Sequence, residues 1–333
     1  MTKKNKTPLG IFTEALGLYF SNFKQFLKYM SFPVWGQLLG LIITFSCAFI
    51  YSKNLPHLIE QYKIFDNFNT LVIISVVVAI PGLIIFIKAF WEYLIAYGAV
   101  NSMLDNMLKS GKVYDFNAHN ELIKRRTASF VALWLILGIF SILASCPLLW
   151  VPAGVIAIYL ALVFQVFTYE PELSPIGCIK RSFELIKGHF ASTFLLMALS
   201  GLVCWLFIPQ IFNYLIDFCS IDKFLVSVVI PITEALPLNE VNEFLIQFNI
   251  PAIKPEELAM LIVTTTTAQI FIQYTLPFRS LLCGLWYKEL NNSSATQTTK
   301  KKSSKKRPSE ILMEESHKRL DKNILKRAME KEE

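Results

Sequence analysis

The sequence predicts an all-α fold, a polytopic membrane helix bundle. It has six transmembrane helices and two interfacial amphipathic helices, which form a parallel internal repeat. Apolar residues make up 54% of the 333-residue chain and charged residues 17%, against about 25% charged residues in soluble domains. Residues 128–169 form a run of 42 residues without charge, which is too long for the core of a water-soluble domain. A short motif also recurs 167 residues further along the chain.

Six apolar runs are long enough to cross a membrane, because about twenty helical residues span a hydrocarbon core of about 30 Å. The corner Pro147–Pro152 between the third and fourth runs is so short that it predicts a tight helical hairpin. Pro209 and Pro277 are expected to kink the last two spans and free backbone carbonyls. The predicted spans are Tyr29–Ile50, Leu71–Ala96, Ala128–Pro147, Val151–Tyr169, Ala191–Leu215 and Leu258–Leu282.

Lys and Arg are unevenly distributed among the connections. With the N-terminus inside, thirteen lie before the first span and in the inner connections, against four in the outer ones. Because cytoplasmic loops are enriched in Lys and Arg, we expect a cell inner membrane protein with both termini in the cytoplasm. No small-residue cleavage site follows the basic start Met1–Lys6 closely, so we expect the N-terminus to be retained.

The chain divides into a six-span membrane domain, residues 1–290, and a basic cytoplasmic tail, residues 291–333. Twelve of the 32 Lys and Arg residues lie between Lys300 and Lys331. We expect this tail to be largely disordered, with one short cationic helix.

The two predicted interfacial helices, about 8–25 and 174–189, begin with the same four-residue pattern. Thr or Ser before Pro predicts an N-cap followed by proline in the first turn, where its missing N–H costs nothing. Apolar residues then follow at spacings that place them on one helical face, typical of a helix lying on a membrane surface. The alternative is that any interfacial helix before a span has this pattern. The matched residues are Thr7, Pro8, Leu9, Gly10, Phe12, Leu16, Tyr19 and Phe23, and Ser174, Pro175, Ile176, Gly177, Ile179, Phe183, Ile186 and Phe190.

The stretch YEPELSPIGCIKRSFELIKGHF, residues 169–190, resembles the E-x-x-S-P-x-x-A-x-x-x-S-W-x-L-x-K-G pattern of a bacterial six-span inner-membrane family. That family includes the membrane domain of glycerophosphoryl diester phosphodiesterases and related membrane proteins. The opening ALGLYFSNFKQFL and the closing TLPFRSLLCGLWYKEL resemble its first helix and last span. Phe183 stands where Trp is common in the family, and Cys178 where Ala is. The resemblance implies fold and compartment. It argues against phosphodiesterase activity, because that chemistry needs a soluble barrel of about 250 residues.

Two pairs of residues are candidates for packing and anchoring. Gly36 and Gly40 form a GxxxG pattern that lets another helix approach closely, within the chain or in a second copy. Lys88 and Glu92, four residues apart near the inner end of the second span, are expected to form an interfacial ion pair. The alternative is that this pair belongs to a polar site.

The last span is unusually polar and is the candidate wall of a cavity between the two repeats. The alternative is a tolerated face whose hydroxyl groups bond back to their own helix. The residues concerned are Thr264, Thr265, Thr266, Thr267, Gln269 and Gln273.

Basic residues near the inner leaflet are the candidates for contact with anionic lipid headgroups, which attract each near-surface Lys or Arg by about 1 kcal/mol. Membrane lipids are therefore the expected partners. Nucleic acid is not expected, because the tail holds no aromatic residue to stack on bases. The candidates are Lys180, Arg181, Lys187, Lys300, Lys301, Lys302, Lys305, Lys306 and Arg307.

No catalytic motif of the common hydrolase, metalloprotease or nucleotide-binding kinds occurs in the sequence. The six cysteines show no paired spacing, so no metal site, disulfide framework or cofactor is expected. The first hypothesis is a non-enzymatic integral membrane protein, a scaffold or subunit in envelope or lipid homeostasis. The alternative is a transporter of a small or lipid-like substrate.

Overall fold

The computed structural model describes residues 6–62, 68–113, 115–234, 236 and 238–304. The described part of the chain holds no β-strand, so the all-α prediction is confirmed. Its elements are α1 (Pro8–Ser21), α2 (Phe23–Gln61), α3 (Phe68–Ser110), α4 (Phe116–Lys124), α5 (Thr127–Ala144), η2 (Pro147–Leu149), α6 (Trp150–Leu160), α7 (Val163–Tyr169), α8 (Pro175–Ile186), α9 (Phe190–Gly201), η3 (Leu202–Phe207), α10 (Ile208–Phe218), α11 (Ile221–Glu234), α12 (Leu238–Gln247), α13 (Pro255–Tyr274) and α14 (Leu276–Ser304).

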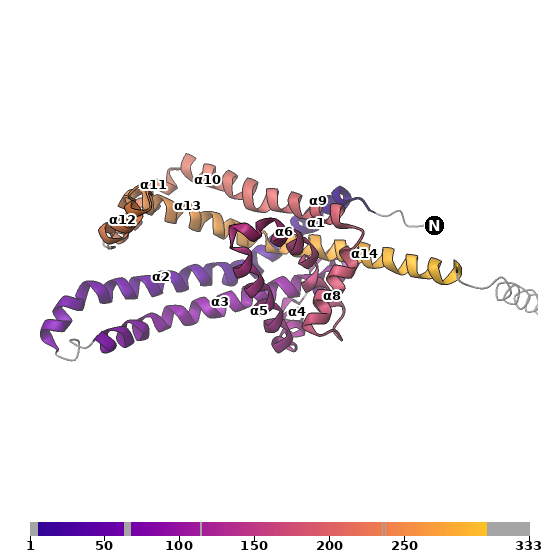
Figure 1. The fold of residues 1–333 in the computed structure, drawn as a ribbon, viewed down its shortest axis with the longest axis horizontal. Coiled ribbons are helices and arrows are strands. Elements are labelled where there is room, and N and C mark those ends of the chain that lie inside the picture. The colour runs from indigo at the N-terminus through magenta and orange to yellow at the C-terminus, as the bar shows by residue number, and fades with distance from the viewer. Residues whose placement is uncertain (1–5, 63–67, 114, 235, 237, 305–333) are drawn as a thin grey trace, which may run out of the picture. The chain divides into compact units, whose positions relative to one another are not determined.

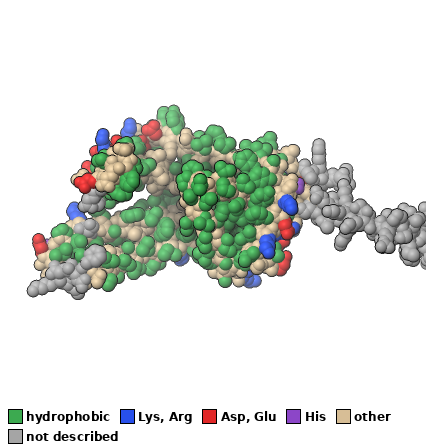
Figure 2. Space-filling model, viewed as in Figure 1, with side chains coloured by type: hydrophobic (Ala, Val, Ile, Leu, Met, Phe, Trp, Pro, Cys, Tyr) green, Lys and Arg blue, Asp and Glu red, His purple; other side chains and the backbone are tan. Residues whose placement is uncertain are grey.

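The chain is a multi-pass membrane protein with five candidate spans, or six if one bent helix pair counts as a single span. The bent pair is α13 with the first part of α14, which meet at 41°. Hydrophobic side chains cover much of the face drawn in Figure 2, as expected for a surface in contact with lipid. The five spans are Phe23–Tyr51, Asn69–Ser110, Thr127–Ala144, Pro147–Tyr169 and Phe190–Phe218.

Two compact units divide the chain, one formed by Lys6–Tyr287 and the other containing Lys288–Glu333. Helix α14 continues to Ser304, past the expected end of the last span at Leu282. No Gly or Pro lies between residues 285 and 307, so no helix-breaking residue stops it earlier. The cationic helix expected further along the tail lies outside the described residues.

Within the Lys6–Tyr287 unit, α2 and α3 lie side by side over much of their length (Figure 1). Helix α13 packs against α10 and α11 and touches α2, while α8 packs against α5, α6 and α7. The connection 217–257, expected to join the last two spans, contains α11 and α12. These helices expose Phe224 and Phe244.

The repeat predicted from sequence is visible in the backbone. The hydroxyl groups of Thr7 and Ser174 each accept a hydrogen bond of 3.2 Å from the N–H three residues further on. Asn22 joins α1 to α2 with φ −118° and ψ 18°. His189, which lies 167 residues later, joins α8 to α9 with φ −123° and ψ 19°. The two copies therefore share a cap. Their common joint conformation is not specific to the repeat, because Arg126 before α5 has a similar φ of −116° and ψ of 32°.

The buried face of α1 and α8 differs from the apolar stripe expected from the sequence. Leu9 and Ile176, which begin that stripe, are each 61% exposed. Helix α1 packs on α9, and α8 packs on three other helices, so protein neighbours rather than lipid determine which face is buried. Only Tyr19 and Ile186 of the predicted stripe are buried. The buried residues are Ile11, Ala15 and Tyr19 in α1 and Cys178, Ser182, Leu185 and Ile186 in α8.

Candidate functional site

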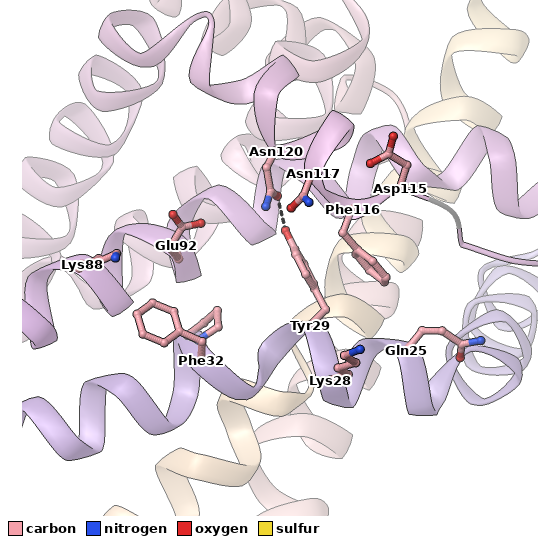
Figure 3. Close-up of a pocket in the computed structure, with 11 residues that line it drawn as sticks. Gln25, Lys28, Tyr29, Phe32, Lys88, Glu92, Asp115, Phe116, Asn117 and Asn120 are labelled. Carbon is pink, nitrogen blue, oxygen red and sulfur yellow. Dashed lines mark hydrogen bonds between the residues drawn. The ribbon is translucent and has the colours of Figure 1, made fainter.

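A pocket of about 800 Å³ lies between α2, α3 and the start of α4 (Figure 3). Its wall combines basic, acidic, aromatic and amide side chains. A site of this size and chemical mixture suits a ligand with both polar and apolar parts. The lining residues are Gln25, Lys28, Tyr29, Phe32 and Pro33 from α2, Lys88 and Glu92 from α3, and Asp115, Phe116, Asn117 and Asn120 at the start of α4.

Helix α4 is fixed at the pocket by contacts at its first turn. The Asp115 carboxylate caps the helix by accepting a 3.1 Å hydrogen bond from the Ala118 N–H. Asp115 has φ 50°, a left-handed conformation that Asp tolerates better than most residues. The Tyr29 hydroxyl donates to Asn120 Oδ1, and the Tyr29 ring stacks on Phe116 with centroids 4.5 Å apart. Helix α2 therefore holds α4 through both parts of one tyrosine.

Lys88 and Glu92 line the pocket but do not form the ion pair expected from their spacing. Glu92 Oε1 lies 3.5 Å from Lys124 Nζ of α4, and Lys88 Nζ lies 5.8 Å from the centroid of the Phe32 ring. The Glu92 carboxylate therefore pairs with a lysine of a neighbouring helix, and residue spacing within α3 could not predict that partner. Among the described residues, Lys88 and Lys28 form no ion pair, so the pocket holds two uncompensated ammonium groups.

Helix α4 also contacts α3 through His119. Ser102 Oγ lies 2.7 Å from His119 Nδ1, and Asn106 Nδ2 lies 3.3 Å from His119 Nε2. Ser102 also donates to the Ala99 carbonyl at 2.8 Å, so the ring donates through Nδ1 and accepts through Nε2. This arrangement suits the neutral imidazole, since a second N–H would face the Asn106 amide donor.

We expect acid to loosen α4 from α3. Burial lowers the pKa of His119 below its usual range, although the Asp115 carboxylate raises it. The unfolded state therefore binds more protons below pH about 6.5. The stability that neutral His119 contributes is present above that pH and is lost as the pH falls through the folded pKa. Thermal unfolding at pH 7.5 and 5.5 should show a larger fall in Tm for the wild type than for His119→Gln. His57→Gln, at an exposed position, is the control and should keep the wild-type difference; an equal fall in all three proteins contradicts this account.

Gly36 and Gly40 lie where α2 and α3 approach most closely. A Cβ atom added at Gly36 would lie 2.8 Å from the Cβ of Ala89, and one at Gly40 would lie 2.8 Å from the Gly82 carbonyl oxygen. The neighbour is thus a helix of the same chain. The sequence analysis identified one side of this contact and missed Gly82 on the other.

Four of the six polar residues of α13 share one face, because Thr265, Thr266, Gln269 and Gln273 follow helical spacing, while Thr264 and Thr267 point away from it. Thr264 and Thr265 are exposed, Thr266 is half-buried and Thr267 is buried. The Thr264 hydroxyl donates to the Met260 carbonyl of its own helix at 2.8 Å. Gln269 is exposed, and Gln273 accepts a 3.3 Å hydrogen bond from Gln37 of α2.

Of the predicted headgroup contacts, Lys180 and Lys187 are exposed on α8. Arg181 instead forms ion pairs with Glu170 at 3.0 Å and Glu184 at 3.6 Å. Glu170 also accepts a 2.7 Å hydrogen bond from the Tyr287 hydroxyl, which fixes the arginine inside the protein. The side chains of the tail lie outside the described residues: Lys300, Lys301, Lys302, Lys305, Lys306 and Arg307.

Two polar features were missed by the sequence analysis. Asn101 is fully buried, and its side-chain oxygen accepts from Gln165 at 3.2 Å and Ser280 at 3.0 Å. Arg279, just after the bend between α13 and α14, is half-buried. A single Arg within the last span is a signal that could have been noticed, because charges in membrane helices usually have a function.

The described residues hold no group of three His, Cys, Asp or Glu side chains that could bind a metal ion. Comparison of the chain with family models, with curated proteins and with solved structures found no match.

Proposed function

We propose that the chain is a non-enzymatic protein of the cell inner membrane, with both termini in the cytoplasm, that binds phospholipid headgroups of the inner leaflet. In this role it serves as a scaffold or subunit in lipid or envelope homeostasis. The observation that carries the proposal is the pocket between α2, α3 and α4, whose two lysines form no ion pair with any described residue.

The chemistry of the pocket suits a headgroup. Lys28 and Lys88 supply two ammonium groups for a phosphate, and Glu92 and Asp115 supply carboxylates for an amine or hydroxyl. Phe32, which lines the same pocket, is 47% exposed and offers an apolar surface to the glycerol and first acyl carbons. The pocket therefore places charged groups next to an apolar surface, as the boundary between a phospholipid headgroup and its acyl chains requires.

The pocket favours this proposal over a carrier. A carrier would need a cavity lined by the polar face of α13, whereas the pocket is lined by α2, α3 and the start of α4. A hydrogen bond and ring stacking fix α4 against α2, and a fixed wall suits a site that retains its ligand rather than one that opens to release it.

Purification tests the proposal. The full chain is extracted from membranes, and co-purifying phospholipids are measured by mass spectrometry. The double variant Lys28→Gln/Lys88→Gln should retain at least about tenfold less anionic phospholipid, because each near-surface lysine contributes about 1 kcal/mol. Lys24→Gln is the matched control, since Lys24 is exposed one turn earlier on α2 and does not line the pocket. Equal lipid retention by the double variant and the wild type would reject the site.

A further inference from the structure

We infer that Arg279 is the centre of a second site, separate from the pocket, which binds an oxyanion: the phosphate of a phospholipid or a free phosphate. Arg279 lies in the bent helix pair that forms the sixth candidate span. The inference rests on hydrogen bonds and charge that the protein itself leaves unsatisfied around this guanidinium.

Few hydrogen-bond acceptors lie close to the N–H groups of the Arg279 side chain. Its Nη2 donates to the Tyr93 hydroxyl and to the Ile272 carbonyl, both at 3.3 Å. The Ile272 carbonyl already accepts from the Thr275 hydroxyl at 2.7 Å and from the Thr275 N–H at 3.2 Å. The Nε atom of Arg279 is buried and has no hydrogen-bond partner among the described residues. A guanidinium carries five N–H donors, so most of them lack a good acceptor.

Its charge is also uncompensated. Among the described residues, Arg279 forms no ion pair. Its neighbours are neutral: the Trp205 ring centroid lies 5.7 Å from Cζ, and Cys204 and Cys283 are close enough to feel the charge. An arginine is never deprotonated in proteins, so the charge is present whatever the surroundings, and charged residues within membrane helices usually pair with a partner.

Arg126 shows how this protein satisfies an arginine that it keeps for structure. Its guanidinium donates to two backbone carbonyls, Phe167 at 2.6 Å and Leu173 at 3.1 Å, and lies 4.1 Å from the Phe167 ring centroid. Both bonds are shorter than those of Arg279, and neither carbonyl belongs to a tight turn of its own helix. Arg279 therefore differs from a structural arginine of the same chain.

Two interrupted helices meet at Arg279. Pro277 lacks an N–H and clashes with the carbonyl four residues earlier, which accounts for the 41° bend between α13 and α14. Opposite, residues Leu202–Phe207 form a π-helix that carries Trp205 and leads into Pro209. Such π-helical turns occur frequently at functional sites. Arg279 is half-buried as a residue, so part of it remains at the surface of the bundle, while its Nε is buried.

An oxyanion supplies what is missing. Phosphate presents several acceptor oxygens and a negative charge, and it accepts two hydrogen bonds from one guanidinium. The adjacent Tyr93 hydroxyl can donate to a further oxygen. Carboxylates of the protein do not fill this role among the described residues, so the acceptor comes from a ligand.

The test measures the thermal midpoint of the full chain, delipidated in a non-ionic detergent. Sodium phosphate is added in one arm and dioleoylphosphatidylglycerol in the other, each against sodium chloride at equal ionic strength. We expect a saturable rise in Tm. A rise with lipid only identifies a phospholipid site, and a rise with both ligands identifies a site for small anions.

Variants decide whether Arg279 is responsible. All Arg279 variants are made in the Lys28→Gln/Lys88→Gln background, so that the pocket does not contribute to the response. That background protein should still show the saturable rise, which separates this site from the pocket, and adding Arg279→Gln should abolish it. Arg279→Lys keeps the charge but loses the planar donor pair. It should raise the half-saturating ligand concentration by about tenfold, as expected for the loss of one hydrogen bond to a charged group, so it tests the site even if the glutamine variant does not fold. The inference is overturned if neither ligand raises the wild-type Tm above the chloride control, or if the Arg279 variants respond as the wild type does.

Discussion

Replacing Gly40 by alanine should destabilise the protein by about 1–3 kcal/mol, the range for forcing an extra methyl group into a packed core. The added Cβ would lie 2.5 Å from the backbone nitrogen of Phe86 and 2.8 Å from the Gly82 carbonyl oxygen. These are backbone atoms of α3, so no side-chain rotation relieves the overlap, and α2 and α3 must separate. Thermal unfolding in detergent, followed by size-exclusion chromatography, measures the effect.

Gly138→Ala is the matched control for this prediction. Gly138 lies inside α5, and a Cβ atom there would meet nothing within 4 Å. Alanine favours a helix over glycine by about 0.5–1 kcal/mol, so this variant should be as stable as the wild type or more so. If Gly40→Ala is as stable as Gly138→Ala, the close approach of α2 and α3 at Gly40 does not contribute to stability and the prediction is wrong.

Replacing Asn101 by alanine should cost about 1–3 kcal/mol, the cost of a buried polar group left without its partner. Asn101 Oδ1 accepts from Gln165 and Ser280, and Asn101 Nδ2 donates to the Tyr97 carbonyl at 3.2 Å. The Ser280 hydroxyl can keep the Tyr97 carbonyl as its acceptor at 2.9 Å, so the Gln165 amide is the group that loses its partner. Urea or thermal denaturation in detergent should show this fall in the free energy of unfolding.

Asn54→Ala provides the comparison for Asn101. Asn54 is exposed on α2 and donates to the Ile50 carbonyl of its own helix, so its loss leaves no buried partner. The change should stay within about 0.5 kcal/mol, as is usual for surface substitutions. Similar losses at both positions would mean that the Asn101 network contributes little.

The helices could be predicted from the sequence because a membrane span can be identified from a continuous run of apolar residues. Apolar runs such as 128–169 and caps such as Thr7 and Ser174 identify helices and their starts without knowledge of neighbours. The buried face of α1 could not be predicted in this way. Both sides of α1 carry apolar residues, and the position of α9 determines that Ile11 rather than Leu9 is buried.

The candidate site was predicted less completely, since it depends on contacts between distant residues. The spacing of Lys88 and Glu92 placed both side chains on one face of α3, yet the Glu92 carboxylate forms its ion pair with Lys124 of α4. Asn101 looked unremarkable in sequence because one asparagine in a long apolar helix carries no pattern. Arg279 was visible as a lone charge, but only the structure shows that it has no anionic partner within the part of the chain that is described.

The packing of α1 on α9 sets an order of assembly during biosynthesis. Helix α1 is made before its packing partner α9, which begins only at Phe190. It cannot dock on α9 until the helices between them have been synthesised. A nascent chain arrested before residue 190 should therefore leave Ile11 and Tyr19, both buried in the finished fold, exposed.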